Sequence, residues 1–136
     1  MLAAALLSML LIAALLAAVF FATTEETRTA VASTASDAAL SDAESAVQAR
    51  VEALASGSGR FPEIGQTEAA SDASGRWSVY VTRLDSTLIW IVGEATGTGA
   101  MTGTVRRIGV FAAMSTDSIG SIRLSPIPER GWSELF

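Results

Sequence analysis

Residues 1–22 read MLAAALLSMLLIAALLAAVFFA, and this stretch decides what kind of protein the chain can be. Ser8 is its only polar side chain, and neither proline nor glycine occurs before Gly57. A helix over this stretch would span about 33 Å, close to the thickness of the hydrocarbon core of a bilayer. The pattern therefore predicts an apolar helix that needs lipid or other apolar helices around it.

Composition limits the remaining possibilities. The chain has 136 residues and a net charge of −5, and all nine basic residues are arginine. This length predicts one modest domain behind the apolar segment, and the lack of a basic stripe argues against nucleic acid as a partner. Cysteine, histidine and lysine are absent, which removes the commonest general base and metal ligand. We expect no enzyme activity, no cofactor and no metal site.

The apolar segment has two interpretations that the residues leave open. A secretory signal peptide carries positive charge ahead of its apolar core, whereas the first cation here is Arg28. The segment is either an uncleaved membrane anchor or the start of a mature chain from which a short charged leader has been removed, and we favour the second. Mass spectrometry of the amino terminus separates them, since an encoded start with formyl-methionine chemistry is expected only for the anchor.

Small residues recur within this segment. Ala13 and Ala17 lie four residues apart, as do Ala14 and Ala18, so each pair shares one face of a helix. Small faces allow close approach of helices in lipid, where packing drives association. The spacing is compatible with bundling of helices, although alanine is abundant throughout the chain.

Residues 23–56 continue the helix with a different pattern. Apolar side chains recur at intervals of three and four residues, at Leu40, Ala43, Val47, Val51 and Leu54. This period is typical of a helix with one apolar stripe. Gly57, Gly59 and Pro62 predict that the helix ends near Ala55. The whole helix would be about 80 Å long.

The first 55 residues resemble the type IV pilin-like proteins, especially the PilX-like and type II secretion minor-pilin branch. The resemblance lies in the start MLAAALL, in the exit TTEETR at residues 23–28, and in DAESAV at residues 42–47, which is similar to a mid-helix Ala-Glu-Ala-Gly stretch of that family. It implies a filament subunit that is stored in the inner membrane and assembled at the cell surface as a helical homopolymer. It also implies a prepilin peptidase, a platform protein and an assembly ATPase as partners. The residues then expected in the filament core are Leu6, Leu10, Ala13, Ala14, Ala17 and Ala18, with Met1 as the processed, methylated end.

Two features depart from the family pattern. Most major pilins carry glutamate at the fifth mature position, thought to pair with a neighbour's amino terminus, whereas this chain has Ala5. An unpaired ammonium in an apolar core is costly, so Ser8 or nearby carbonyl oxygens are candidates to compensate it. The chain also lacks the proline common near position 22, which favours a continuous helix.

The carboxy-terminal half, residues 76–136, has the alternating pattern of strands. Residues 57–75 are expected to form a loop, followed by strands over residues 77–84, 88–94 and 104–114. Ile119, Ile122 and Leu124 suggest a short edge strand, and we expect the Trp132 side chain to fix the tail. The predicted fold is α+β: one long helix, hydrophobic and then amphipathic, packed on a small antiparallel sheet of three to four strands. Packing of helix on sheet is expected from Leu40, Val47, Val51, Leu54, Trp77, Val79 and Val81.

The remaining polar motifs do not indicate chemistry. The glycine-rich residues 96–103 lack the Gly-Lys-Ser/Thr of a phosphate-binding loop and lead into a strand, so we interpret them as a hairpin. Arg106 and Arg107 should point to opposite faces of a strand, which favours a solvated pair or a salt bridge between subunits over an anion site. A third group of charges occupies the polar helix face, where a solvated or intersubunit surface is expected: Asp37, Asp42, Glu44 and Glu52.

These patterns predict a structural subunit of a type IV pilus-like filament. The alternative is a non-polymerising, single-pass membrane protein that carries a small extracytoplasmic binding domain. An archaeal-type pilin also lacks the glutamate, but a larger all-β sandwich would be expected there.

Overall fold

The computed structural model describes residues 2–97, 103–118, 122–127 and 131–135. The chain divides into two parts, Met1–Thr34 and Ala35–Phe136, and each is considered by itself below. The first part is helical. The second contains the remainder of the helix and an antiparallel sheet that packs on it, so the α+β class predicted from the sequence is confirmed.

Helix α1 extends over Leu2–Ala55 and ends where the sequence predicts. Gly57 adopts a positive φ of 75°, a conformation that glycine reaches without steric cost. The chain then turns back, and the Gly59 N–H donates to the Ala53 carbonyl at 2.7 Å. The turn therefore satisfies a carbonyl that the last turn of the helix leaves open.

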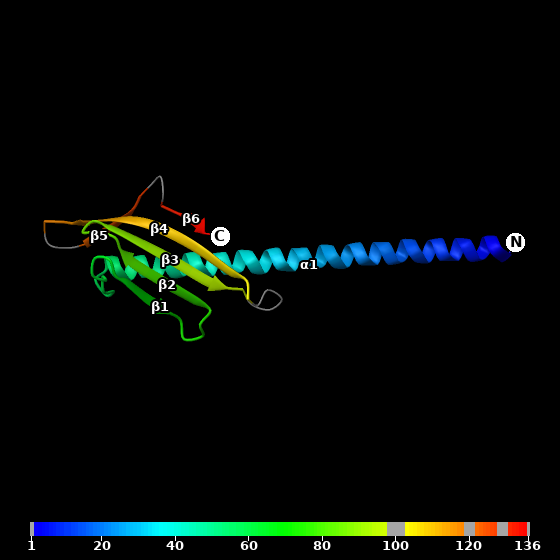
Figure 1. Cartoon of the computed structure of the whole chain (residues 1–136), viewed down its shortest axis with the longest axis horizontal. Helices are drawn as coiled ribbons and strands as arrows, with labels where there is room; N and C mark the ends of the chain where they lie inside the picture. Colours follow the sequence, from blue (N-terminus) through cyan, green and yellow to red (C-terminus); the bar gives the residue numbers. More distant parts are fainter. Residues whose placement is uncertain (1, 98–102, 119–121, 128–130, 136) are drawn as a thin grey trace. The chain divides into compact units, whose positions relative to one another are not determined.

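The sheet is antiparallel throughout the described residues, and its order is β1-β2-β3-β4-β5 (Figure 1). Its two longest strands, β3 (Leu88–Thr96) and β4 (Val105–Thr116), lie side by side near the middle. On the far side of β4, β6 pairs with residues 107–109 and β5 with residues 112–116. The other strands are β1 (Thr67–Ser71), β2 (Trp77–Arg83), β5 (Ile122–Pro126) and β6 (Ser133–Leu135).

Three expectations need correction. Within the described residues the sheet has six strands rather than three to four, and β1 lies inside residues 57–75, which were expected to be a loop. The expected edge strand exists as β5, although Ile119 lies outside the described residues. Trp132 does not fix the tail, because its side chain is 49% exposed; backbone pairing of β6 with β4 does so instead.

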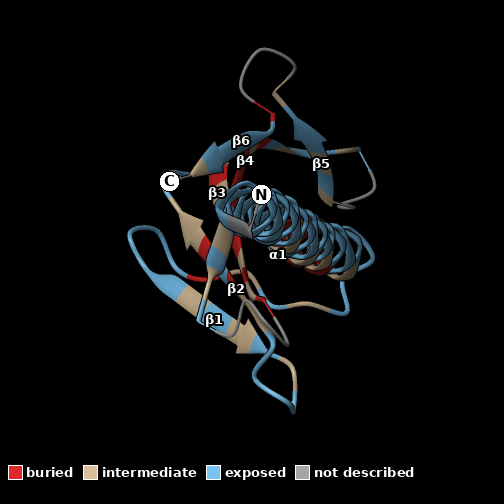
Figure 2. Ribbon diagram, turned by 90° about the vertical axis from the view of Figure 1, so that its right-hand side faces the viewer, coloured by how far each residue is buried: buried red, intermediate tan, exposed pale blue. Residues whose placement is uncertain are grey.

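The core lies on the sheet face that the helix covers. Strand register brings Val79, Gly93 and Ile108 into one row across the sheet, and Val81, Ile91 and Val110 into the next. Figure 2 shows the buried residues, in red, on the central strands β2, β3 and β4. Since alternate residues of a strand face the same side, this face is apolar while the other carries mixed side chains.

Arg106 joins three elements of the second part. Its Nε donates to the Oγ of Ser36 on the helix at 2.7 Å, and its Nη1 donates to Glu134 on β6 at 2.8 Å. Ser36 is the buried polar residue of this region, with 8% of its surface exposed. A guanidinium at the end of the core is thus held by one hydroxyl and one carboxylate.

Replacement of Ser36 by alanine should lower the free energy of unfolding by about 1–2 kcal/mol, because the Arg106 Nε would lose its acceptor in a part-buried position. Glu134→Gln should cost less, about 0–1 kcal/mol, since the pair it belongs to is partly exposed. Urea titration followed by tryptophan fluorescence measures both. Equal losses for the two variants would contradict this ranking.

Two aspartates organise the turns that flank β2. The Asp72 carboxylate accepts hydrogen bonds from the Ser74 hydroxyl and the Trp77 N–H. The Asp85 carboxylate accepts from the Thr87 N–H and hydroxyl, and from the Leu88 N–H at 2.8 Å. Bonding to Ser74 lowers the pKa of Asp72, and bonding to the Thr87 N–H lowers the pKa of Asp85, both from an ordinary 3.8.

A lowered pKa in the folded state means that stability is present above the unfolded value and is lost as pH falls through the folded value. We therefore expect the free energy of unfolding to decrease as the pH is lowered below 3.8, the ordinary pKa of aspartate. Asp72→Asn and Asp85→Asn should each make this acid dependence shallower. Unfolding titrations from about pH 6 down to about pH 2 test it, and an unchanged slope in both variants would refute the assignment.

Candidate functional site

The candidate site is the apolar segment of the first part. Its large side chains are exposed on every side of the helix; Leu6 is 60% exposed and Leu10 is 73% exposed. The four alanines expected in a filament core, Ala13, Ala14, Ala17 and Ala18, are exposed as well. Met1 lies outside the described residues. The segment is long and apolar enough to cross a membrane, so it is compatible with membrane anchoring.

Polar side chains near this segment satisfy themselves within the helix. The Ser8 hydroxyl donates to the Ala4 carbonyl at 2.7 Å. At the end of the apolar run, Thr24 donates to the Phe20 carbonyl and Thr27 to the Thr23 carbonyl. A hydroxyl bonded in this way presents little unmet polarity, so an apolar environment can surround the helix at low cost.

Charge begins where the apolar run ends. Glu25 and Arg28 form an exposed ion pair at 3.0 Å, one turn apart on the helix. Phe20 and Phe21 precede the pair and are 76% and 70% exposed. The exposed side chains thus change from apolar to charged within about one turn of the helix. Helix α1 continues without a break through this change from apolar to charged side chains.

The seven residues expected to pack helix on sheet come together in the second part. Val47, Leu54, Val79 and Val81 are buried in one cluster. Leu40, Val51 and Trp77 are partly buried and pack against that cluster. They belong to the hydrophobic core of this part of the chain.

The acidic helix residues are divided by the structure. Asp37, Glu44 and Glu52 are exposed. Asp42 forms an ion pair with Arg76 at 3.1 Å, which ties the helix to the turn before β2. Across the described residues, no group of three acidic, histidine or cysteine side chains could hold a metal ion.

The two adjacent arginines of β4 serve opposite faces, as strand geometry requires. Arg106 bonds on the helix side, whereas Arg107 pairs with Glu94 at 2.7 Å on the other side. The Glu94 carboxylate raises the pKa of Arg107, which stays charged. The three partners of these arginines, Ser36, Glu134 and Glu94, belong to the same chain. Residues 98–102 of the glycine-rich segment lie outside the described residues.

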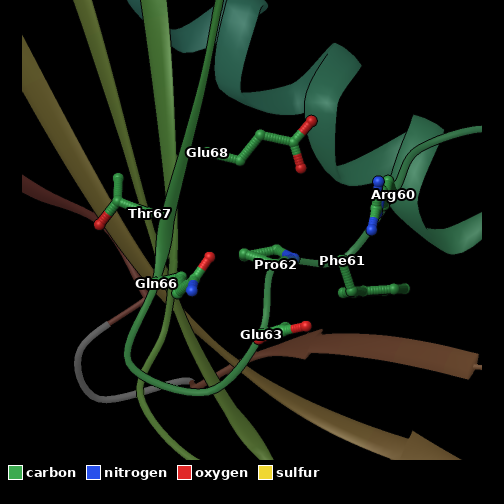
Figure 3. Close-up of a pocket in the computed structure, with 7 residues that line it drawn as sticks. All are labelled: Arg60, Phe61, Pro62, Glu63, Gln66, Thr67 and Glu68. Atoms are coloured by element: carbon green, nitrogen blue, oxygen red, sulfur yellow. The ribbon is translucent and has the colours of Figure 1, made fainter.

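A polar hollow lies beside β1 (Figure 3). Its volume is about 290 Å³, and Phe61, Pro62, Gln66 and Glu68 are among its lining residues. In Figure 3 the Glu68 side chain extends toward the helix, where Arg50 binds it at 3.2 Å. Because the Glu68 carboxylate is already paired with Arg50, it is not available to bind a ligand in the hollow.

Sequence reasoning missed three features of the second part. It missed the Arg50–Glu68 pair, because β1 was not predicted. It missed the stacking of Trp90 on Phe111, whose rings lie 5.8 Å apart on the sheet face away from the helix. The alternation within β3 and β4 could have placed these two rings on that face. It also missed a cavity beside Arg83, described below.

Comparison with protein-family models, with curated proteins and with solved structures finds no match to this chain.

Proposed function

We propose that the chain is a structural subunit of a type IV pilus-like extracellular filament. It is stored in a membrane through residues 1–22 and assembles when these segments pack against those of other copies. The observation that carries the proposal is the exposure of the apolar helix, whose large side chains from Leu6 to Phe21 remain 57% to 76% exposed.

The exposed apolar side chains are stable only when lipid or other apolar helices cover them. Each large apolar side chain gains about 1.5–3 kcal/mol on transfer from water to an apolar environment. Lipid covers these side chains before assembly. Sister helices can cover them afterwards, so that lipid contacts are exchanged for contacts with identical helices.

The small face supports a polymer over a simple anchor. Ala13, Ala14, Ala17 and Ala18 lie within one stripe of about 140° around the helix, so a neighbouring helix can approach this small face closely. A single-pass anchor needs no such face. The alternative function remains a non-polymerising, membrane-anchored protein whose second part binds a ligand.

Imaging tests the proposal first. Material sheared from cells that express the full chain should contain filaments when negatively stained, and these filaments should contain this protein. Isolated copies without lateral contacts, each with its apolar segment covered by detergent, would overturn the proposal and leave the anchor.

Cross-linking tests the contact itself. The chain has no cysteine, so a single introduced thiol has no competing partner within the chain. Ala17→Cys should form disulfide-linked dimers in membranes or filaments under mild oxidation. Ala38→Cys, which is exposed on the helix of the second part, is the matched control and should form fewer.

A further inference from the structure

A cavity of about 510 Å³ opens on the sheet face that the helix covers elsewhere. Its apolar lining comes from Phe61, Met114 and Ile122, and its polar lining includes Arg83 and Thr116. All of these residues belong to the second part of the chain. The volume is in the range of sites for small organic ligands.

The cavity exists because strand β4 extends beyond the part of the sheet that the helix covers. Successive rows of the sheet meet successive turns of α1: Arg106 meets Ser36, and a Cβ on Gly93 would touch Val47. The helix ends at Ala55, whereas β4 runs on to Thr116. Cover over the Met114 row comes from Phe61, which is itself partly buried.

Strand register fixes which side chains face this space. Met114 pairs with Leu124, and Thr116 pairs with Ile122, so alternate residues of both strands point to the helix side. Arg83 lies across the sheet on the same face, paired with Ile89. An arginine thus stands at the edge of an apolar hollow.

Arg83 has donor capacity left over. Its Nε donates to the Asp85 carbonyl at 3.1 Å and its Nη2 to the Ser86 carbonyl at 3.5 Å. Among the hydrogen bonds of the described residues, Nη1 takes part in none. The charge of Arg83 contributes to the lowered pKa of Asp85, but the Asp85 carboxylate accepts its hydrogen bonds from the N–H and hydroxyl groups of its own turn.

We infer that this cavity binds a small organic monoanion with an apolar body, an aryl or medium-chain alkyl carboxylate. The apolar body lies against Phe61, Met114 and Ile122. The carboxylate accepts from the Arg83 guanidinium and from the Thr116 hydroxyl. One arginine beside an apolar lining suits a monoanion; a phosphate dianion would require more cations. This inference is independent of filament assembly.

The test uses the full chain in phosphatidylcholine nanodiscs and 4-fluorophenylacetate as the probe, followed by fluorine NMR. Binding should be saturable, with a dissociation constant of about 1 mM, since a small ligand has limited contact area. The neutral analogue 4-fluorobenzyl alcohol should bind roughly tenfold more weakly, because it cannot form charge-assisted hydrogen bonds. Equal signal changes with empty nanodiscs would show partition into lipid and overturn the inference.

Variants locate the site. Arg83→Gln should raise the dissociation constant roughly tenfold. Arg123→Gln removes the same charge from an exposed position on β5 and should leave binding unchanged. Thr116→Glu places a carboxylate at the rim and should abolish binding while Arg83 keeps its turn contacts, so it decides the question if Arg83→Gln does not fold. Unchanged affinity in Thr116→Glu, or equal effects of the two arginine variants, would refute the site.

Discussion

A valine at Gly93 should unfold the second part of the chain. Gly93 lies on β3 beneath the helix, between Val79 and Ile108 in the sheet. A Cβ built at this position would lie 2.5 Å from the Val47 Cγ2 and 2.7 Å from the Ala43 carbonyl oxygen. Side chains can rotate away, but the carbonyl belongs to the helix backbone and can move only with the helix.

The expected loss is large because the clash involves both the core and the backbone. We expect Gly93→Ala to lower the free energy of unfolding by about 3 kcal/mol and Gly93→Val by more. Domains of this size are stable by roughly 5–15 kcal/mol, and the two further methyl groups of valine should raise the loss to about 5 kcal/mol or more, so the valine variant should be largely unfolded. Urea titration with tryptophan fluorescence measures this, because Trp77, Trp90 and Trp132 all lie in the second part.

Gly75→Ala is the matched control. Gly75 has a φ of 70° and nothing within 4 Å of a built Cβ, so alanine there meets conformational strain but no clash. It should cost about 1–2 kcal/mol. If Gly93→Ala were as stable as the native chain, the close approach of helix and strand at this point would be wrong.

Ala14→Arg should abolish the proposed filament while the second part stays folded. Ala14 lies near the middle of the apolar run, where an arginine costs about 2.5–3.5 kcal/mol in membrane insertion alone. In a filament core the charge would also face apolar neighbours in every copy. Counting filaments by electron microscopy measures the loss, and tryptophan fluorescence checks that the second part is intact.

Ala14→Leu separates close packing from hydrophobicity. Leucine keeps the segment apolar, so a membrane anchor should tolerate it fully. A polymer that relies on the small face should lose most of its filaments, because the larger side chain separates adjacent helices. Ala38→Arg, at an exposed position of the helix in the second part, is the control for added charge. Normal filaments from Ala14→Leu would remove the small face from the proposal.

The candidate site could be predicted from the sequence only where it depends on local pattern. The exposed apolar segment can be predicted from the sequence because almost every residue from Met1 to Ala22 is apolar. The cavity beside Arg83 cannot be predicted from the sequence, since it depends on how far β4 extends beyond the end of the helix. Phe61, Met114 and Ile122 each look like ordinary apolar residues until the fold brings them together.

The sequence alone determined the helix over Leu2–Ala55, its end before Gly57, and the face of β2 that enters the core. These features follow from period, from glycine and from alternation, which act within a few residues.

Only the tertiary structure decided that TEAAS at Thr67–Ser71 is a strand, since alanine, glutamate and serine have weak preference for strands. Pairing with β2 supplies what the sequence lacks. A Thr67–Thr82 hydroxyl contact at 2.8 Å and the Arg50–Glu68 ion pair hold the strand in place. Strand β6 likewise exists because β4 offers it an edge. Pairing with a neighbouring strand thus overrides the weak local preference of these residues for the strand conformation.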